Sequence, residues 1–279
     1  MHARTIAAMI CGALACDGCR HSSPAAPSTS PGGATTAWSD EFDGLAQSLP
    51  DPGKWTYDLG NNNGWGNREL ETYTSSVENV HLDGLGHLVI RVASTPAGFT
   101  SARIKTQGRF AAQYGHLEAR IQLPAGQGIW PAFWLLGNGF DGTNWPQIGE
   151  VDICENRGSE PSVNHGSLHG PSYSGGNAIT ATYVLPSGEK FATGFHLFAI
   201  DWAPQSIAFL VDGMTYKTVT PASLPSGASW VFDAPFFLIL NVAVGGNFPG
   251  PPDATTMFPQ EMLVDYIRYT PLTKSGAPR

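Results

Sequence analysis

Hydrophobic and polar residues alternate one by one along much of the chain, which is the pattern of β-strands with one buried face. Asp212-Gly213 separates two of these runs and is a pair typical of tight hairpin turns. No segment shows a long apolar stripe of period 3.6, and no repeat of fixed length is present. The pattern predicts one all-β domain, either a sandwich or a barrel. The alternating runs cover residues 88–92, 102–106, 115–121, 195–202 and 263–269, and two further strands are predicted at 207–211 and 215–217, on either side of the Asp212-Gly213 turn.

Residues 236–242 are nearly all apolar and are interrupted only by Asn241. A strand that is apolar on both faces is expected inside a sheet, where it is covered on both sides. A buried asparagine needs hydrogen-bond partners, so a structural hydrogen bond is one interpretation of Asn241.

The composition agrees with many short strands joined by turns. Only 14% of the 279 residues are charged, whereas glycine (33) and proline (22) are abundant. The hydrophobic content of 42% allows a core and excludes global disorder. The net charge of −8 leaves no basic face for nucleic acid and disfavours a polyanionic substrate. A neutral polymer, bound by aromatic faces and hydrogen bonds, fits best.

Residues 1–20 are predicted to be an export signal. Arg4 supplies a positive charge, residues 5–15 are mostly apolar but too few to span a bilayer, and residues 13–15 form a small-x-small cleavage pattern. A buried N-terminal helix is the alternative. Cys16 follows the apolar run directly, so the protein is expected to be secreted, or to be a cell-envelope lipoprotein if Cys16 is lipidated. Against lipidation, Ala13 stands where leucine is usual.

Residues 21–36 are rich in serine, proline and glycine and are predicted to form a flexible linker. A single domain is expected over residues 37–271, followed by a short tail at 272–279. Cys154 is the one cysteine of that domain, so it has no partner there for a disulfide. We predict no integral membrane span and expect a monomer.

Three carboxylates lie close together in the segment 148–157. On a strand, Glu150 and Asp152 point to one face, and the residues between and after them point to the core. Strict alternation sends Glu155 into the core as well, where an unpaired carboxylate is costly. One inserted residue, a β-bulge near residues 153–154, returns Glu155 to the face of Glu150.

Three acids on one strand face repel one another, which raises the pKa of at least one of them. A proton is then held near neutral pH, as a glycosidase needs when one carboxylate attacks and another protonates the leaving group. A solvated acidic strand edge is the alternative interpretation. Aromatic residues at 130–134 and 144–146 flank the acids, and an acidic cleft lined by aromatic rings favours a carbohydrate site.

Residues 150–155, Glu-Val-Asp-Ile-Cys-Glu, resemble the active-site signature of glycoside hydrolase family 16, in the bulged form typical of laminarinases. The resemblance spans about residues 38–270 and implies a jelly-roll β-sandwich of the concanavalin and legume-lectin type with a concave substrate cleft. The implied activity is endo-acting, retaining hydrolysis of 1,3-β-glucan. Further motifs of the family lie at residues 38–42, 65–70, 101–106, 128–134, 240–246 and 264–269.

By this resemblance Glu150 matches the nucleophile and Glu155 the acid/base. Asp152 matches the residue between them, which hydrogen-bonds the nucleophile and tunes its pKa; a mere strand acid is the alternative. No cofactor is expected for catalysis. Cys154 departs from the family, where methionine or another apolar residue is more usual, and is expected to pack as a small hydrophobe.

The resemblance also implies a set of substrate-binding residues. Asn63 and Arg103 match polar residues of the non-reducing-side subsites, and the two tryptophans match rings that stack on sugars. Structural alternatives are a tryptophan that faces the core, Arg103 paired with a surface acid, and a structural role for the histidine or Asn241. The full set is Asn63, Arg103, Trp130, Trp134, His169 and Asn241.

A structural calcium ion is often found on the convex side of this family. The ligands implied here are the carbonyl oxygens of Glu41 and Gly86 and the side chain of Asp265. All-oxygen ligation suits calcium.

Two other functions stay open. A non-catalytic glucan-binding protein has the same fold, although the presence of both Glu150 and Glu155 argues against it. An enzyme of the same family acting on mixed-linkage glucan or another neutral polysaccharide, such as agarose, is the second. The bulged signature and the tryptophan-rich cleft favour 1,3-β-glucan, while the lack of a basic cleft disfavours sulfated galactans.

Overall fold

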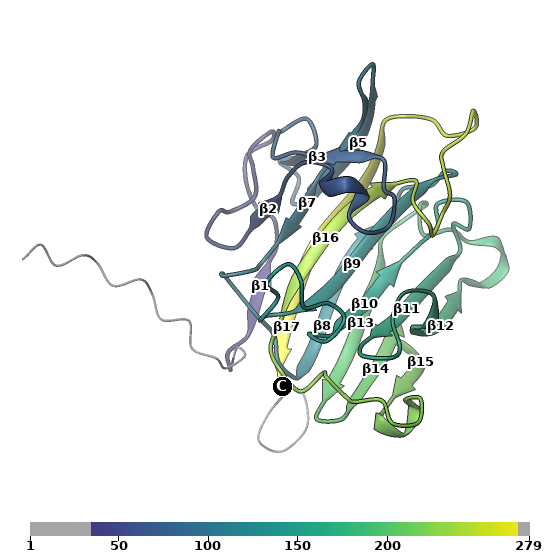
Figure 1. Cartoon of the computed structure of the whole chain (residues 1–279). Helices are drawn as coiled ribbons and strands as arrows, with labels where there is room; N and C mark the ends of the chain where they lie inside the picture. Colours follow the sequence, from purple (N-terminus) through teal and green to yellow (C-terminus); the bar gives the residue numbers. More distant parts are fainter. Residues whose placement is uncertain (1–34, 273–279) are drawn as a thin grey trace, which may run out of the picture. The chain divides into compact units, whose positions relative to one another are not determined.

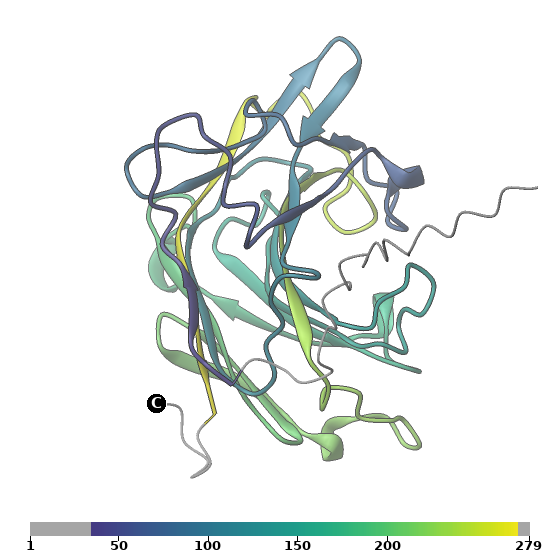
Figure 2. The same cartoon turned by 90° about the vertical axis from the view of Figure 1, so that its left-hand side faces the viewer.

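Two β-sheets packed face to face form the structure (Figure 1), and Figure 2 shows them from the side as two layers. This computed structural model describes residues 35–272. The predicted export signal, nearly all of the linker and the last seven residues of the tail lie outside the described residues. No helix within residues 35–272 has the length and apolarity that a bilayer crossing requires. The two packed sheets confirm the predicted β-sandwich.

The first sheet has ten strands in the order β15-β14-β13-β8-β17-β5-β6-β3, with β1 paired to β17 and β4 to β5. Its strands are β1 (Trp38–Asp40), β3 (Glu71–Tyr73), β4 (Val80–Leu82), β5 (Leu88–Thr95), β6 (Gly98–Ser101), β8 (Gly115–Gln122), β13 (His196–Ala203), β14 (Ser206–Val211), β15 (Met214–Val219) and β17 (Gln260–Pro271).

The second sheet has seven strands in the order β12-β11-β10-β9-β16-β7-β2, all antiparallel. Single 3-10 turns supply the helical segments of residues 35–272: η1 (Asn62–Gly64), η2 (Gly175–Asn177), η3 (Pro186–Gly188) and η4 (Pro221–Ser223). The strands are β2 (Thr56–Asp58), β7 (Arg103–Lys105), β9 (Ile129–Gly137), β10 (Glu150–Glu155), β11 (Val163–His169), β12 (Ile179–Val184) and β16 (Phe236–Val244).

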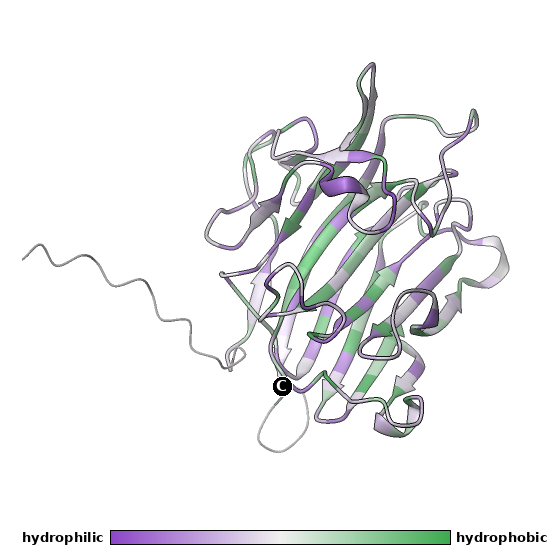
Figure 3. Ribbon diagram, in the orientation of Figure 1, coloured by the Kyte–Doolittle hydropathy of each residue, from purple (hydrophilic) through white to green (hydrophobic). Residues whose placement is uncertain are grey.

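The alternation of the sequence maps onto this sandwich. Polar and apolar residues alternate along the strands in Figure 3. In β8, buried and partly exposed residues follow one another without exception. Asp212 and Gly213, with φ of 50° and 77°, both have the left-handed backbone that a type I′ hairpin requires, so the predicted turn is also confirmed.

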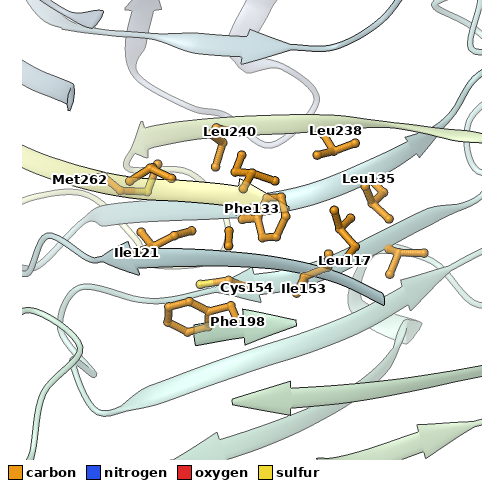
Figure 4. Packing of buried hydrophobic residues seen from close by; sticks show 14 of the residues in the cluster. Leu117, Ile121, Phe133, Leu135, Ile153, Cys154, Phe198, Leu238, Leu240 and Met262 are labelled. Carbon is orange, nitrogen blue, oxygen red and sulfur yellow. The ribbon is translucent and has the colours of Figure 1, made fainter. Parts of the chain in front are cut away.

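The core lies between the two sheets. Figure 4 shows side chains of β8, β13 and β17 from one sheet meeting those of β9, β10 and β16 from the other. Cys154 belongs to this core, has no exposed surface and is a free thiol, as predicted for a small hydrophobe.

Strand β16 is buried at all nine positions, as its apolar sequence predicts. One face packs into the main core. On the other face, Phe237 and Ile239 form a small second cluster with Leu136, and Trp134 and Phe140 pack against it. This second cluster lies on the outer face of the second sheet, where the candidate site is found.

Candidate active site

The outer face of the second sheet is hollowed into a cleft of about 1020 Å³. Strands β7, β16, β9, β10, β11 and β12 all contribute side chains to its lining. Most of the residues predicted from the sequence to form the site meet here. They are Arg103, Trp130, Trp134, Glu150, Asp152, Glu155, His169 and Asn241.

A β-bulge in β10 brings the three acids to this face. On the side of β11, Asp152 pairs with Ser167 and Glu155 with His165, so two residues of β10 lie opposite one residue of β11. Those two residues, Ile153 and Cys154, are both buried in the core. The bulge therefore turns Glu155 back toward Glu150, as the sequence predicted.

Burial and mutual repulsion dominate the electrostatics of the acids. Burial, and next the charge of Asp152, raise the pKa values of Glu150 and Glu155 to about 8. Burial alone raises the pKa of Asp152 to about 8. Near neutral pH the group therefore retains protons, which is the condition for acid catalysis by a carboxyl.

Two tryptophans hydrogen-bond the outer acids. The indole N–H of Trp145 donates to Glu150 Oε2 at 3.0 Å, and that of Trp130 donates to Glu155 Oε1 at 3.1 Å. Each bond fixes the rotamer of its carboxyl group and stabilises the ionised form. The indole of Trp145 is still partly exposed, so its ring is available at the cleft wall.

The loop after β11 fixes the tautomer of His169. The backbone N–H of Gly175 donates to Nδ1 of His169 at 3.1 Å, so this nitrogen carries no hydrogen. The hydrogen of the neutral ring is therefore on Nε2, which lies 2.9 Å from Asp152 Oδ2 and 3.6 Å from Glu150 Oε1. His169 thus directs an N–H toward the acids rather than a lone pair, and Nε2 is not free to bind a metal.

We expect ¹⁵N NMR of the imidazoles at neutral pH to show a protonated Nε2 and a bare Nδ1 for His169. His81 is the matched control, because its Nδ1 lies 2.8 Å from the carbonyl oxygen of Val77 and must itself carry the hydrogen. The two rings should therefore show opposite tautomers. A hydrogen on Nδ1 of His169 would contradict the assignment.

Trp130 and Trp134 both face the cleft, which excludes the alternative that one faces the core. Asn241 also lines the cleft, and both ends of its amide are hydrogen-bonded within the protein. Its Oδ1 accepts from Trp134 Nε1 at 2.8 Å, and its Nδ2 donates to the hydroxyl of Tyr73 at 3.1 Å. Asn241 therefore holds the ring of Trp134 in place.

Arg103 both lines the cleft and pairs with an acid, so the two interpretations of its role apply together. Its guanidinium lies between the rings of Trp65 and Trp134, 4.8 and 4.7 Å from their centroids, and lines the cleft. Its Nε is also 3.0 Å from Asp58 Oδ2. The acid orients the guanidinium, and the two rings hold its plane in the cleft wall.

The comparisons with known proteins agree with this geometry. The model of the glycosyl hydrolases family 16 matches residues 66–268. The chain belongs to glycosyl hydrolase family 16. It is therefore a glycoside hydrolase.

Similar proteins come from several organisms. A "Beta-glucanase" of Rhodothermus marinus is 40% identical, with 83% of each chain covered. The laminarinase catalytic domain of Thermotoga maritima is 46% identical, with a TM-score of 0.77 over 83% of this chain and 96% of that one. The endo-beta-1,3-glucanase of Pyrococcus furiosus is 46% identical, with a TM-score of 0.77 over 83% of this chain and 92% of that one.

Asn63 was predicted to bind substrate, but the structure does not place it in the cleft. It lies in η1, is exposed, and is not among the residues that line the cleft. Its neighbour Asn62 lines the cleft instead. Both residues have left-handed backbone, with φ of 45° and 54°, so the turn rotates their side chains in a way that strand alternation does not describe.

Several residues of the cleft were not singled out from the sequence. Trp145 appeared only within a flanking aromatic segment, and its bond to Glu150 depends on the path of the loop after β9. The polar or aromatic character of the others gave no signal by itself, and most of them are distant in sequence from the three acids. They are Asn62, Trp65, Glu69, Arg157, His165 and Phe248.

The predicted calcium ligands lie away from the cleft. Asp40 pairs with Ile267 and Leu88 with Val264, so the chain segments that contain Glu41 and Gly86 both reach β17 beside Asp265. The calcium ligand set stays a prediction. The carboxylate of Asp265, however, accepts a hydrogen bond from Arg120, which an ion would have to share or displace.

Proposed function

We propose that this family 16 enzyme is an endo-acting, retaining β-glucanase that cleaves 1,3-β-glucan. The observation that carries the proposal is the bulged strand β10, which brings Glu150 and Glu155 to one face of a cleft lined by tryptophans. The relatives named above, a β-glucanase, a laminarinase and an endo-1,3-glucanase, support the same substrate class. The pattern of residues 1–20 supports export of the enzyme.

In this proposal Glu150 attacks the anomeric carbon while Glu155 donates a proton to the glycosidic oxygen. The bond to the leaving sugar breaks, and a glycosyl ester forms on Glu150. Glu155, now ionised, takes a proton from water, which attacks the ester and releases the sugar with a free Glu150. Asp152 lies between the two acids along β10, His169 faces Asp152 and Glu150 from β11, and both orient Glu150 during both steps.

The cleft favours a neutral glucan. Trp65, Trp130 and Trp134 offer flat apolar surfaces for sugar rings, and Arg103 and Asn62 offer hydrogen-bond donors near them. Release of reducing ends from laminarin, lichenan and agarose, assayed side by side, tests the substrate. We expect laminarin to be cleaved fastest; cleavage of agarose alone, or of none of the three, would refute the proposal.

We expect the β-configuration to be retained in the first products. Double displacement inverts the anomeric carbon twice, so early proton NMR spectra of a laminarin digest should show the β-anomer before mutarotation. An initial α-anomer would mean direct attack by water and a wider spacing of the two carboxylates.

We also propose that calcium binds beside Asp265 and stabilises the fold without taking part in catalysis. The expected result is a lower melting temperature in EDTA that is restored by Ca²⁺, with no effect of Asp265→Asn on kcat at low temperature. If EDTA leaves the melting temperature unchanged, no such ion is bound.

A further inference from the structure

The bulge in β10 is held from behind by a side chain of the neighbouring strand β11. Asn164 has no exposed surface, and its Nδ2 donates to the carbonyl oxygen of Ile153 at 3.2 Å. On the side of β9, the partners of Asp152 and Cys154 are consecutive residues, so Ile153 is the inserted one. Asn164 therefore hydrogen-bonds the backbone at the bulge itself.

A tyrosine of the first sheet reaches the same amide. Strand β15 carries Tyr216, whose hydroxyl oxygen accepts a hydrogen bond from Asn164 Nδ2 at 3.2 Å. Gly166 makes room for this hydroxyl, because a Cβ at that position would overlap the hydroxyl oxygen. The rings of Tyr183 and Phe209 lie with their centroids 5.6 and 6.1 Å from that of Tyr216. The hydroxyl is thus fixed behind the bulge, where it holds the amide.

The amide of Asn164 is bonded at one end only. Its Oδ1 is buried and has no hydrogen-bond partner among the residues that the structure describes. An unpaired buried oxygen costs free energy, so stability alone does not account for an asparagine here. What the amide provides is the bond to Ile153, which satisfies a carbonyl oxygen where the bulge interrupts the regular ladder. Asn164 thus serves the shape of the bulge more than the packing of the core.

The bulge determines where the acid/base lies. Glu155 follows Ile153 by two residues, and strict alternation without a bulge would turn its side chain into the core. Glu150 lies before the bulge, where its pairing with β9 and β11 is regular. A change at the bulge should therefore move Glu155 more than Glu150.

We propose that Asn164 and Tyr216 are positioning residues that hold the β-bulge and thereby fix the place of Glu155 relative to the nucleophile. Neither residue lines the cleft, so they act through the backbone of β10 and not on the substrate. This inference rests on the proposed roles of the two acids. It assigns the alignment of the proton donor with the glycosidic oxygen to two residues of the core.

The two positioning residues act through hydrogen bonds and not through charge. Burial raises the pKa of the Tyr216 hydroxyl above its ordinary value, and burial likewise raises the pKa of the neighbouring Cys154 thiol. Both groups are therefore neutral at neutral pH, and the amide of Asn164 does not ionise. Replacing Asn164 or Tyr216 with an apolar residue thus leaves the charge around the three acids unchanged.

Two substrates whose leaving groups differ in quality test the proposal. Laminarin needs the proton of Glu155, whereas 2,4-dinitrophenyl β-laminaribioside releases its phenolate without one. For Asn164→Leu, which keeps a similar size but removes the N–H, we expect kcat/KM to fall about tenfold or more on laminarin and less than about threefold on the aryl glycoside. The KM for laminarin should stay within about twofold, because the cleft wall is unaltered. For Tyr216→Phe we expect the same contrast with a smaller loss on laminarin.

Asn79→Leu is the matched control for Asn164→Leu. Asn79 is also buried, and its Nδ2 also donates to a backbone carbonyl and to a hydroxyl, but it lies in the first sheet beside β4. Tyr269→Phe is the control for Tyr216→Phe, because Tyr269 is a buried tyrosine of β17 whose hydroxyl donates to backbone carbonyl oxygens. Both controls should lower the melting temperature and leave the ratio of the two kcat/KM values unchanged.

The ratio of the two kcat/KM values decides between a positioning and a merely structural role. A ratio equal to that of the wild type in a folded variant would overturn the assignment of the residue replaced, while leaving the glucanase assignment intact. A wild-type enzyme that cleaves neither substrate would instead refute the proposed function. Thermal melts show which variants fold, and Tyr216→Phe, which removes a single oxygen atom, tests the same support of the bulge if Asn164→Leu does not fold.

Discussion

Replacing Glu150 with glutamine is expected to lower kcat on laminarin by about four orders of magnitude or more while the chain still folds. The amide keeps the shape of the side chain and still accepts the hydrogen bond from Trp145, but it cannot form the glycosyl ester. The loss is expected for good and poor leaving groups alike. Activity within tenfold of the wild-type value would refute Glu150 as the nucleophile.

The same substitution has a second effect, on stability. The folded enzyme holds a proton on Glu150 up to a pKa of about 8, whereas an unfolded glutamate releases it near its usual pKa of 4.5. The free energy of unfolding therefore falls as the pH rises from about 4.5 to about 8. Glutamine does not ionise, so Glu150→Gln should melt at a higher temperature than the wild type at pH 8 and show a flatter pH dependence. Glu261→Gln, a change of an exposed acid on the other sheet, should do neither.

Replacing Glu155 with alanine is expected to separate substrates by their leaving groups. Turnover of laminarin should fall by about three orders of magnitude or more, because a sugar leaves poorly without a proton. Activated aryl glycosides should be affected far less in the first step, and azide should raise turnover by attacking the ester on Glu150 and releasing a β-glycosyl azide. Equal losses on all substrates without azide rescue would mean that Glu155 is not the acid/base.

The pH profile gives an independent check on Glu155. Its pKa is raised to about 8, and the acid must be protonated when the bond breaks. Wild-type kcat/KM on laminarin should therefore fall as the pH rises through about 8. With Glu155→Ala and an activated aryl glycoside, that alkaline decline should disappear, because the ionisation of Glu150 with rising pH favours its attack.

Sequence periodicity identified the long strands because each is long enough to show it. Residues 115–121 alternate cleanly and lie in β8, which buries every second residue. The strands β1 to β4 have three residues each, too few for a period, and their pairing depends on partners far along the chain. The arrangement of the two sheets came from the resemblance to family 16 and not from the alternation.

The sequence predicted the part of the site whose residues lie on a single strand. The bulge at residues 153–154 follows from the cost of burying Glu155, and the structure has it at that place. Contacts made by loops could not be predicted from the sequence. The bond from Gly175 to His169, the displacement of Asn63 from the cleft, and the bond from Trp145 to Glu150 all depend on backbone conformations that no side-chain pattern encodes.

The bulge has a consequence for how the enzyme responds to its surroundings. The spacing between Glu150 and Glu155 is set from behind, by Ile153 and Cys154 wedged into a close-packed interior. Protein interiors are about as incompressible as organic crystals. The two acids are thus held by the close-packed core. Moderate hydrostatic pressure should therefore change the affinity for the substrate before it changes the distance between the two carboxyl groups. By the same reasoning, a substitution that changes the side-chain volume at Cys154 should change the distance between the two carboxyl groups, although Cys154 is buried in the core and does not contact the substrate.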